Sequence, residues 1–208
     1  AHNCKSFSGM EEIYVNNYTF GVNERNVNNV FMGYKHGVCG YNVGTMQEDG
    51  SFLGTVGTGA LEFANSNTQY MGMNCIKHGF RFNYDVGYSS IQGTDNSIIK
   101  NGTAISNTWS IGWTNKDWNV EFGQPLAITD GELNVDVASS VNANGTHNYS
   151  NYSVNIDPDH RHTVAKIGWQ SPFITDNVNV NVDVEYNNNY ANTDSDSWSI
   201  ATGVEYVF

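Results

Sequence analysis

Hydrophobic and polar residues alternate along most of this chain. The clearest run is NVNVNVDVEY at 177–186, where the even positions hold four valines and a tyrosine and the odd positions hold only Asn, Asp and Glu. The same two-residue period recurs at 80–88, 109–113, 118–122, 133–137, 165–169 and 198–208, with Val207 as an exception. A period of two predicts β-strands whose two faces meet different surroundings.

Further segments carry the same alternation less regularly, at 12–22, 29–36, 38–46 and 67–78. Turn-rich stretches separate the strands, namely TNKD, ITDGE, NANGTHN, SPFITD and NNNYANTDSDS. No segment shows a convincing helical period of 3.6 residues, and 94–103 stays unassigned. We therefore expect an all-β fold of about 12 strands over residues 12–208, with residues 1–11 as an N-terminal segment or linker.

Two architectures hold many alternating strands. A soluble sandwich or barrel turns its apolar face inward, whereas a transmembrane barrel turns it toward lipid and its polar face toward a wet lumen. Aromatic rings favour the second, because Trp and Tyr gather at the two membrane interfaces. Such rings lie near the predicted strand ends at Trp109, Trp113, Trp118, Trp169, Trp198, Tyr88, Tyr186 and Tyr206. The sequence predicts a transmembrane, antiparallel, up-and-down β-barrel.

The chain ends on an alternating strand that carries an aromatic residue at its last position, Phe208. Ile200, Val204 and Tyr206 precede it at alternate positions, with Thr202 a weaker match. This stretch resembles the terminal strand of Gram-negative outer-membrane proteins. The resemblance implies that Ile200, Val204, Tyr206 and Phe208 form a membrane anchor and an assembly signal for the barrel-assembly machinery, and that the chain lies among outer-membrane lipids.

A second resemblance rests on four stretches in order, TFGVNERNVNNVFMGYKHG, GTMQEDGSFLGTVGTGALEFANSNTQYMG, ISNTWSIGW and VEFGQPLAITDGELNVDV. They are similar to the C-terminal translocator barrel of autotransporters of the subtilisin-like protease family. The resemblance implies a barrel that supports secretion or surface display of an N-terminal passenger polypeptide. The chain contains no subtilisin-like Asp, His or Ser motif, so any protease activity is expected in a passenger and the barrel itself is not expected to be an enzyme.

The charged residues argue against one class of partner and predict the ion preference of an open lumen. The formal net charge is −12 with only 9 Lys and Arg, which argues against a nucleic-acid partner. On the polar faces of the predicted strands, acidic residues outnumber basic ones, so an open lumen should prefer cations. The residues expected to face the lumen are Arg81, Asp85, Glu121, Asp136, Lys166, Asp183, Glu185 and Glu205.

The remaining motifs give little indication of a disulfide, phosphate-binding or metal-binding site. The cysteines Cys4, Cys39 and Cys75 allow at most one disulfide, and buried thiols are the favoured interpretation. GTVGTG at 54–59 lacks the lysine of a phosphate loop, MQEDGSF fits a plain turn, and DPDHRH, with His160 and His162, fits a turn better than a zinc site. We expect no catalytic residue, metal or cofactor.

Two alternatives stay open. One is a small stand-alone outer-membrane pore or a structural or partner-binding barrel. The less favoured one is a barrel lipase or deacylase using an outward His78, for which no partner Ser or Asp is identifiable.

Overall fold

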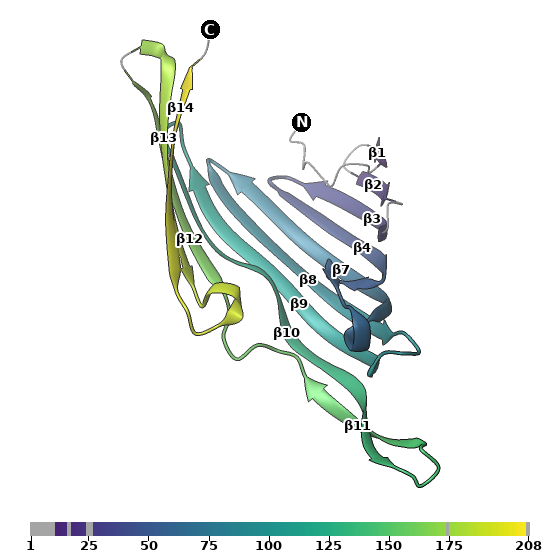
Figure 1. Cartoon of the computed structure of the whole chain (residues 1–208). Helices are drawn as coiled ribbons and strands as arrows, with labels where there is room; N and C mark the ends of the chain where they lie inside the picture. Colours follow the sequence, from purple (N-terminus) through teal and green to yellow (C-terminus); the bar gives the residue numbers. More distant parts are fainter. Residues whose placement is uncertain (1–10, 16–17, 24–26, 174, 207–208) are drawn as a thin grey trace.

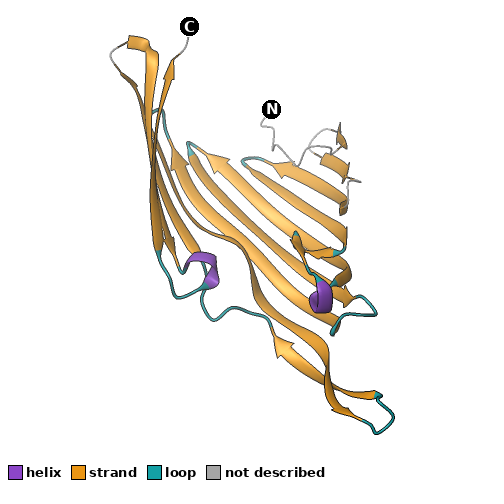
Figure 2. Cartoon of the chain, viewed as in Figure 1, coloured by secondary structure: helices purple, strands orange, loops and turns teal. Residues whose placement is uncertain are grey.

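A computed structural model describes residues 11–15, 18–23, 27–173 and 175–206. The chain is 76% β-strand, and the described residues contain no α-helix (Figure 2). The prediction of an all-β fold is therefore confirmed. The first strands are β1 (Glu11–Val15), β2 (Tyr18–Asn23), β3 (Val27–His36), β4 (Cys39–Asp49), β5 (Ser51–Phe52), β6 (Thr55–Val56), β7 (Phe63–Lys77) and β8 (Phe80–Gly93).

The second half of the chain contains the longest strands. They are β9 (Ile99–Thr114), β10 (Trp118–Val141), β11 (His147–Asn155), β12 (Thr163–Phe173), β13 (Thr175–Asn188) and β14 (Ser197–Tyr206). Two single turns of 3-10 helix, η1 (Gly59–Leu61) and η2 (Tyr190–Asn192), lie in connections.

Twelve of these strands form one sheet in the order β1-β2-β3-β4-β7-β8-β9-β10-β12-β13-β14, and β11 pairs with β10 beside this path. All pairs are antiparallel, and β5 and β6 form a separate two-stranded ribbon. Apart from the β5–β6 ribbon and β11, strands that follow one another in the chain are neighbours in the sheet, as expected for an up-and-down topology. Figure 1 shows β10 running the length of the sheet, with β11 beside its far half and β12 beside its first half.

The expected closed barrel is not seen, because the described sheet is open, with β1 and β14 at its two edges (Figure 1). The directions of the two edge strands explain why β1 and β14 do not form an antiparallel pair. Eleven strands lie on the path from β1 to β14 and every neighbour is antiparallel, so β1 and β14 run in the same direction. The twelfth strand, β11, does not contribute to this path.

The two ends of the sheet differ in their connections. At one end, the short-turn rim, β3–β4, β7–β8 and β9–β10 are joined by residues 37–38, 78–79 and 115–117. At the other end, the long-connection rim, the connections are 50–62, 94–98, 142–146, 156–162 and 189–196. The C-terminal end of β14 lies at the short-turn rim, because β14 runs parallel to β9 and β12.

Several predicted boundaries were wrong. ITDGE at 128–132 is no turn but the middle of β10, where register shifts between Gln124 and Ala127 and between Ile128 and Asp130 mark β-bulges. The predicted strand at 12–22 is two strands, β1 and β2. The unassigned stretch 94–103 contains the start of β9, and β11 was not expected.

Candidate functional site: the apolar and polar faces of the sheet

Residues directly opposite each other in an antiparallel sheet project to the same side, so the register traces each face across the strands. One row contains Ile200, Val184, Ile167, Val120, Trp113 and Phe80. The next contains Trp198, Tyr186, Ala165, Phe122, Ile111 and Phe82. A third contains Trp109, Tyr84, Met73, Tyr41 and Tyr34. We call this surface the apolar face.

The apolar face is uncovered. Val204 is 73% exposed, Trp198 70% and Phe80 60%, and no second sheet packs on it among the described residues. Soluble monomers rarely expose contiguous apolar patches larger than a few hundred Å². The soluble sandwich considered from the sequence is therefore not the observed arrangement.

Two of the strands carry apolar stretches of equal length. On β8 the outward residues run from Phe80 to Tyr88, and on β13 they run from Val178 to Tyr186, nine residues each. At about 3.4 Å per residue these stretches span roughly 27 Å along the strand. A transmembrane β-strand needs about 9–11 residues, so the stretch is long enough.

The opposite surface, the polar face, collects most of the residues that the sequence placed in a lumen. Arg81 and Asp85 share one side of β8, Asp183 and Glu185 share one side of β13, and the register joins both to Glu121 of β10 through Gly112 and Lys166. In β14, the backbone of Glu205 lies opposite that of Asn179 in β13.

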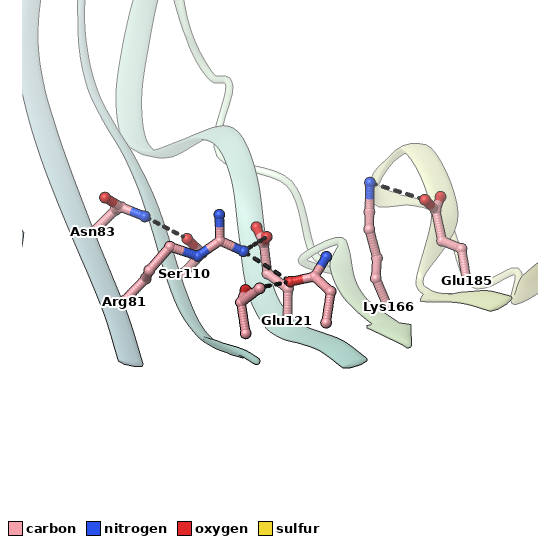
Figure 3. A network of polar contacts seen from close by, with 8 residues as sticks. Arg81, Asn83, Ser110, Glu121, Lys166 and Glu185 are labelled. Atoms are coloured by element: carbon pink, nitrogen blue, oxygen red, sulfur yellow. Dashed lines mark hydrogen bonds and ion pairs between the residues drawn. The ribbon is translucent and has the colours of Figure 1, made fainter. Parts of the chain in front are cut away.

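Four charged residues of alternating sign lie in one row across the polar face, in the order Glu185, Lys166, Glu121 and Arg81. We call them the charge row. Lys166 Nζ lies 2.9 Å from Glu185 Oε2, and Arg81 Nη2 lies 3.5 Å from Glu121 Oε2 (Figure 3). Both pairs are partly exposed, so each is expected to stabilise the fold by only about 0–1 kcal/mol. Their main effect is to cancel charge locally.

Hydrogen bonds to uncharged side chains, and one between two of them, extend the charge row. Arg81 Nη2 also donates to Asn119 Oδ1 at 3.0 Å, and Asn83 Nδ2 donates to Ser110 Oγ at 3.0 Å (Figure 3). Side-chain contacts of the row thus join β8 to β9 and β10, and separately β12 to β13, while the backbone ladder joins all of these strands.

Glycines let polar side chains lie flat on this face. A Cβ added at Gly168 would lie 2.5 Å from Asp183 Oδ1, and one added at Gly40 would lie 2.6 Å from Asn74 Oδ1. The Gly40 amide donates to the same Asn74 oxygen at 3.1 Å. With large rings on one face and glycines on the other, the sheet has room to curl toward its polar face.

Asp136 is the charged residue that the structure separates from the others. The two bulges of β10 each shift the register, and Asn134 then lies opposite Asn101, on the side of β9 that carries Trp109 and Ile111. Asp136 projects to the same side as Asn134 and accepts a hydrogen bond from Asn151 Nδ2 at 3.0 Å. Beyond the bulges the side of β10 that was apolar has become polar, with Asp130, Glu132, Asn134 and Asp136.

The expected terminal anchor is only partly within the described residues. Ile200 and Val204 lie on the apolar face, opposite Val184 and Val180, and the backbone of Tyr206 lies opposite Val178. Phe208 lies outside the described residues.

The interpretation of the cysteines as thiols was wrong for two of them. Cys39 and Cys75 lie opposite each other in β4 and β7 and form a disulfide, on the apolar face near the short-turn rim. Disulfides persist in oxidising compartments such as the periplasm and the cell surface. Cys4 lies outside the described residues.

The histidines that the structure describes do not come together in a metal-binding cluster. Within the described residues, no group of three or more His, Cys, Asp and Glu side chains could hold a metal ion. His162 Nε2 shares a hydrogen bond of 2.9 Å with Asn187 Oδ1, and His78 occupies the two-residue turn between β7 and β8 with φ of 50°. DPDHRH is a connection leading into β12, as the sequence predicted.

The described residues contain no helix long and apolar enough to cross a bilayer.

No protein-family model matches this chain, and no curated protein matches it either.

Proposed function

We propose that this chain is a β-barrel of the Gram-negative outer membrane, with the apolar face toward lipid and the polar face toward a lumen. The uncovered apolar face is the observation that carries the proposal. A surface of this extent needs an apolar partner, and the nine-residue apolar stretches match the thickness of a bilayer.

The asymmetry between the two rims supports the same function. Outer-membrane barrels have short turns on the periplasmic side and longer loops on the outside. The short-turn rim, where β14 ends, is accordingly assigned to the periplasm, and the long-connection rim to the cell exterior. The polar outward side of β10 beyond its bulges fits a strand that leaves the membrane into water.

In the membrane the two edges of the sheet cannot stay unpaired, because an unsatisfied backbone N–H or C=O in hydrocarbon costs several kcal/mol. The functional form therefore needs a pairing partner along the free edge of β14. This closure is part of the proposal and is tested below.

The proposed role of the barrel is to support export of an N-terminal passenger polypeptide to the cell surface. Support comes from the sequence resemblance to subtilisin-like autotransporters. A stand-alone pore is the second candidate, favoured by Asp85 and Asp183, two carboxylates of the polar face that form no ion pair among the described residues.

The barrel is tested by refolding the chain into lipid vesicles and measuring amide exchange along β14. In a closed barrel all amides of Ser197–Tyr206 are protected, whereas a free edge leaves every second amide exchanging fast. A heat-modifiable band on gels is expected alongside. Fast exchange of alternate amides in a membrane-inserted chain would contradict closure.

Export is tested by placing a signal peptide and an epitope passenger before the chain in a Gram-negative cell. We expect external protease to remove the epitope, while the same passenger without the barrel stays protected in the periplasm. A barrel that inserts but leaves its passenger protected would rule out the translocator and favour the stand-alone pore.

A further inference from the structure

The connection at 50–62, which contains β5, β6 and η1, folds back over the polar face at the long-connection rim. We call it the capping loop. It covers a row made of Glu48, Ser66, Ile91, Gly102 and Leu133, which lie opposite one another across β4 and β7–β10. Ile91 is on the same side of β8 as Arg81, ten residues or about 34 Å farther along. The charge row and the capping loop therefore occupy opposite ends of one surface.

Apolar packing holds the loop down. Phe52 of the loop is 6% exposed, and it packs with Ile91 and Ala104 of the sheet, which are 0% and 1% exposed. Phe52 also makes an edge-to-face contact with Phe63, with ring centroids 6.1 Å apart. Leu53, Ile128, Leu133 and Ile156 complete this cluster.

A buried carboxylate anchors the loop from beneath. Glu48 is 2% exposed, and its oxygens accept hydrogen bonds from the amides of Leu53 at 2.7 Å and Gly54 at 2.9 Å. The hydroxyls of Ser51 and Ser66 donate to it at 3.2 and 3.3 Å. Leu53 and Gly54 turn their amides toward the carboxylate with φ of 48° and 76°. Hydrogen bonds to a charged acceptor are the strong ones, and a buried charge must be satisfied in this way.

The loop is also tied to the neighbouring connection at 94–98. The Ile98 amide donates to the Ala60 carbonyl at 2.9 Å, and Ser97 Oγ donates to the same oxygen at 3.1 Å. The Thr94 amide donates to the Glu62 carbonyl at 3.3 Å. Two connections thus form one ordered unit over the polar face.

We propose that the capping loop is a plug that closes the lumen at the outer mouth and is held shut by Glu48. This inference rests on the proposed barrel. In a lumen, a dry cluster built on the polar face excludes water and ions from the cross-section it fills. Opening the plug requires Glu48 to lose its two backbone donors and Phe52 to leave its place beside Ile91. The charge row at the other end leaves that end polar and wet.

Single-channel conductance of the refolded full chain tests the plug. Deleting Ser51–Val56 should raise conductance several-fold over the parent chain, and Glu48→Gln should add brief openings to the same level. The matched controls are deletion of Ala143–Gly145 at the tip of the β10–β11 hairpin and Asp49→Asn, an exposed neighbour of Glu48. Both controls should conduct like the parent chain.

Amide exchange gives a second measurement that needs no conductance. In Glu48→Gln the Leu53 and Gly54 amides should exchange about tenfold faster or more, because their charged acceptor is lost. Asp49→Asn should leave both rates unchanged.

The outcomes separate the plug from the barrel. If the parent chain and the loop deletion have the same conductance, whether high or negligible, the plug is wrong and the barrel proposal is unaffected. Failure of the chain to insert into vesicles would overturn the barrel. Unchanged amide exchange at Leu53 and Gly54 in Glu48→Gln would overturn the role of Glu48 as the anchor of the loop.

Discussion

Val182→Arg distinguishes a membrane-facing surface from a wet one. Val182 is the middle of the five outward positions of β13, which run from Val178 to Tyr186, and it lies opposite Trp169 and Thr202 on the apolar face. Being central in a stretch of bilayer thickness, it should lie near the membrane midplane. Its neighbour Asn181 projects to the polar face opposite Gly203 and Gln170 and is the matched control.

The magnitude depends on depth. An arginine on the lipid face costs about 2–4 kcal/mol at the midplane and about 0–1 kcal/mol near the interface. Val178 is four residues from Val182, roughly 14 Å along the strand and roughly 10 Å along the membrane normal for a strand tilted by about 40°. We therefore expect a cost of about 2–4 kcal/mol for Val182→Arg, about 0–1 kcal/mol for Val178→Arg, and little for Asn181→Arg.

Urea unfolding in lipid vesicles, followed by tryptophan fluorescence, measures these three free energies of unfolding. A cost of 2–4 kcal/mol corresponds to roughly a 30- to 700-fold change in the unfolding equilibrium constant. If the apolar face were in water, Val182→Arg would be a surface substitution with an effect within about 0.5 kcal/mol. Equal costs at Val182 and Asn181 would refute the assignment of the two faces.

Three more predictions follow from particular contacts. Cys39→Ser removes the disulfide to Cys75 across a sequence separation of 36 and should lower the free energy of unfolding by about 2–4 kcal/mol, measured by urea titration with the reduced parent chain as control. Lys166→Gln frees Glu185 from its ion pair, so in the chain lacking Ser51–Val56 it should strengthen cation preference in reversal-potential measurements, more at low salt than at high salt. Hydrogen bonds from the Tyr186 hydroxyl and the Asn189 amide lower the pKa of Asp196 below its ordinary 3.8, so its stabilisation of 189–196 is present above pH 3.8 and lost as the pH falls through the lower folded value. Exchange of the Asn189 amide should accelerate in that acid range, and Asp196→Asn should abolish the acceleration.

Alternation in the sequence was enough to predict the sheet and its two faces where strands are regular. Val182, Val184 and Tyr186 lie opposite Trp169, Ile167 and Ala165 of β12, because a period of two leaves one choice of face once a strand forms. The charge row follows from the same logic, since Lys166 and Glu185 each stand at a polar position of a regular strand.

The alternation in the sequence did not predict the irregular features of the fold. In β10 the turn-like residues ITDGE form part of a strand, because the ladders to β9 and β11 outweigh local turn propensity. The two bulges each add one residue to β10 and together restore its alternation, so Asp136 shares the side of Val120 and Phe122. The local pattern of Leu133, Val135 and Val137 around Asn134 and Asp136 is what misplaced Asp136. The capping loop was equally hidden, since MQEDGSF looks like any turn until Glu48 is seen buried beneath it. The available signal was Glu48 at a polar-face position of its strand, with Gly50 and Gly54 in the turn that follows.

The path of β10 accounts for both the open edge and the need for closure. Its 24 residues exceed what a membrane requires, and the half beyond the bulges pairs with β11 while the first half pairs with β12. This division leaves eleven strands around the path, so that β1 and β14 point the same way. A direct seam between them would be the one parallel pair in the sheet, and parallel pairing is slightly less stable per residue. A strand running opposite to β14 along its free edge would instead extend the antiparallel pattern and the alternation of apolar and polar faces that every other pair obeys.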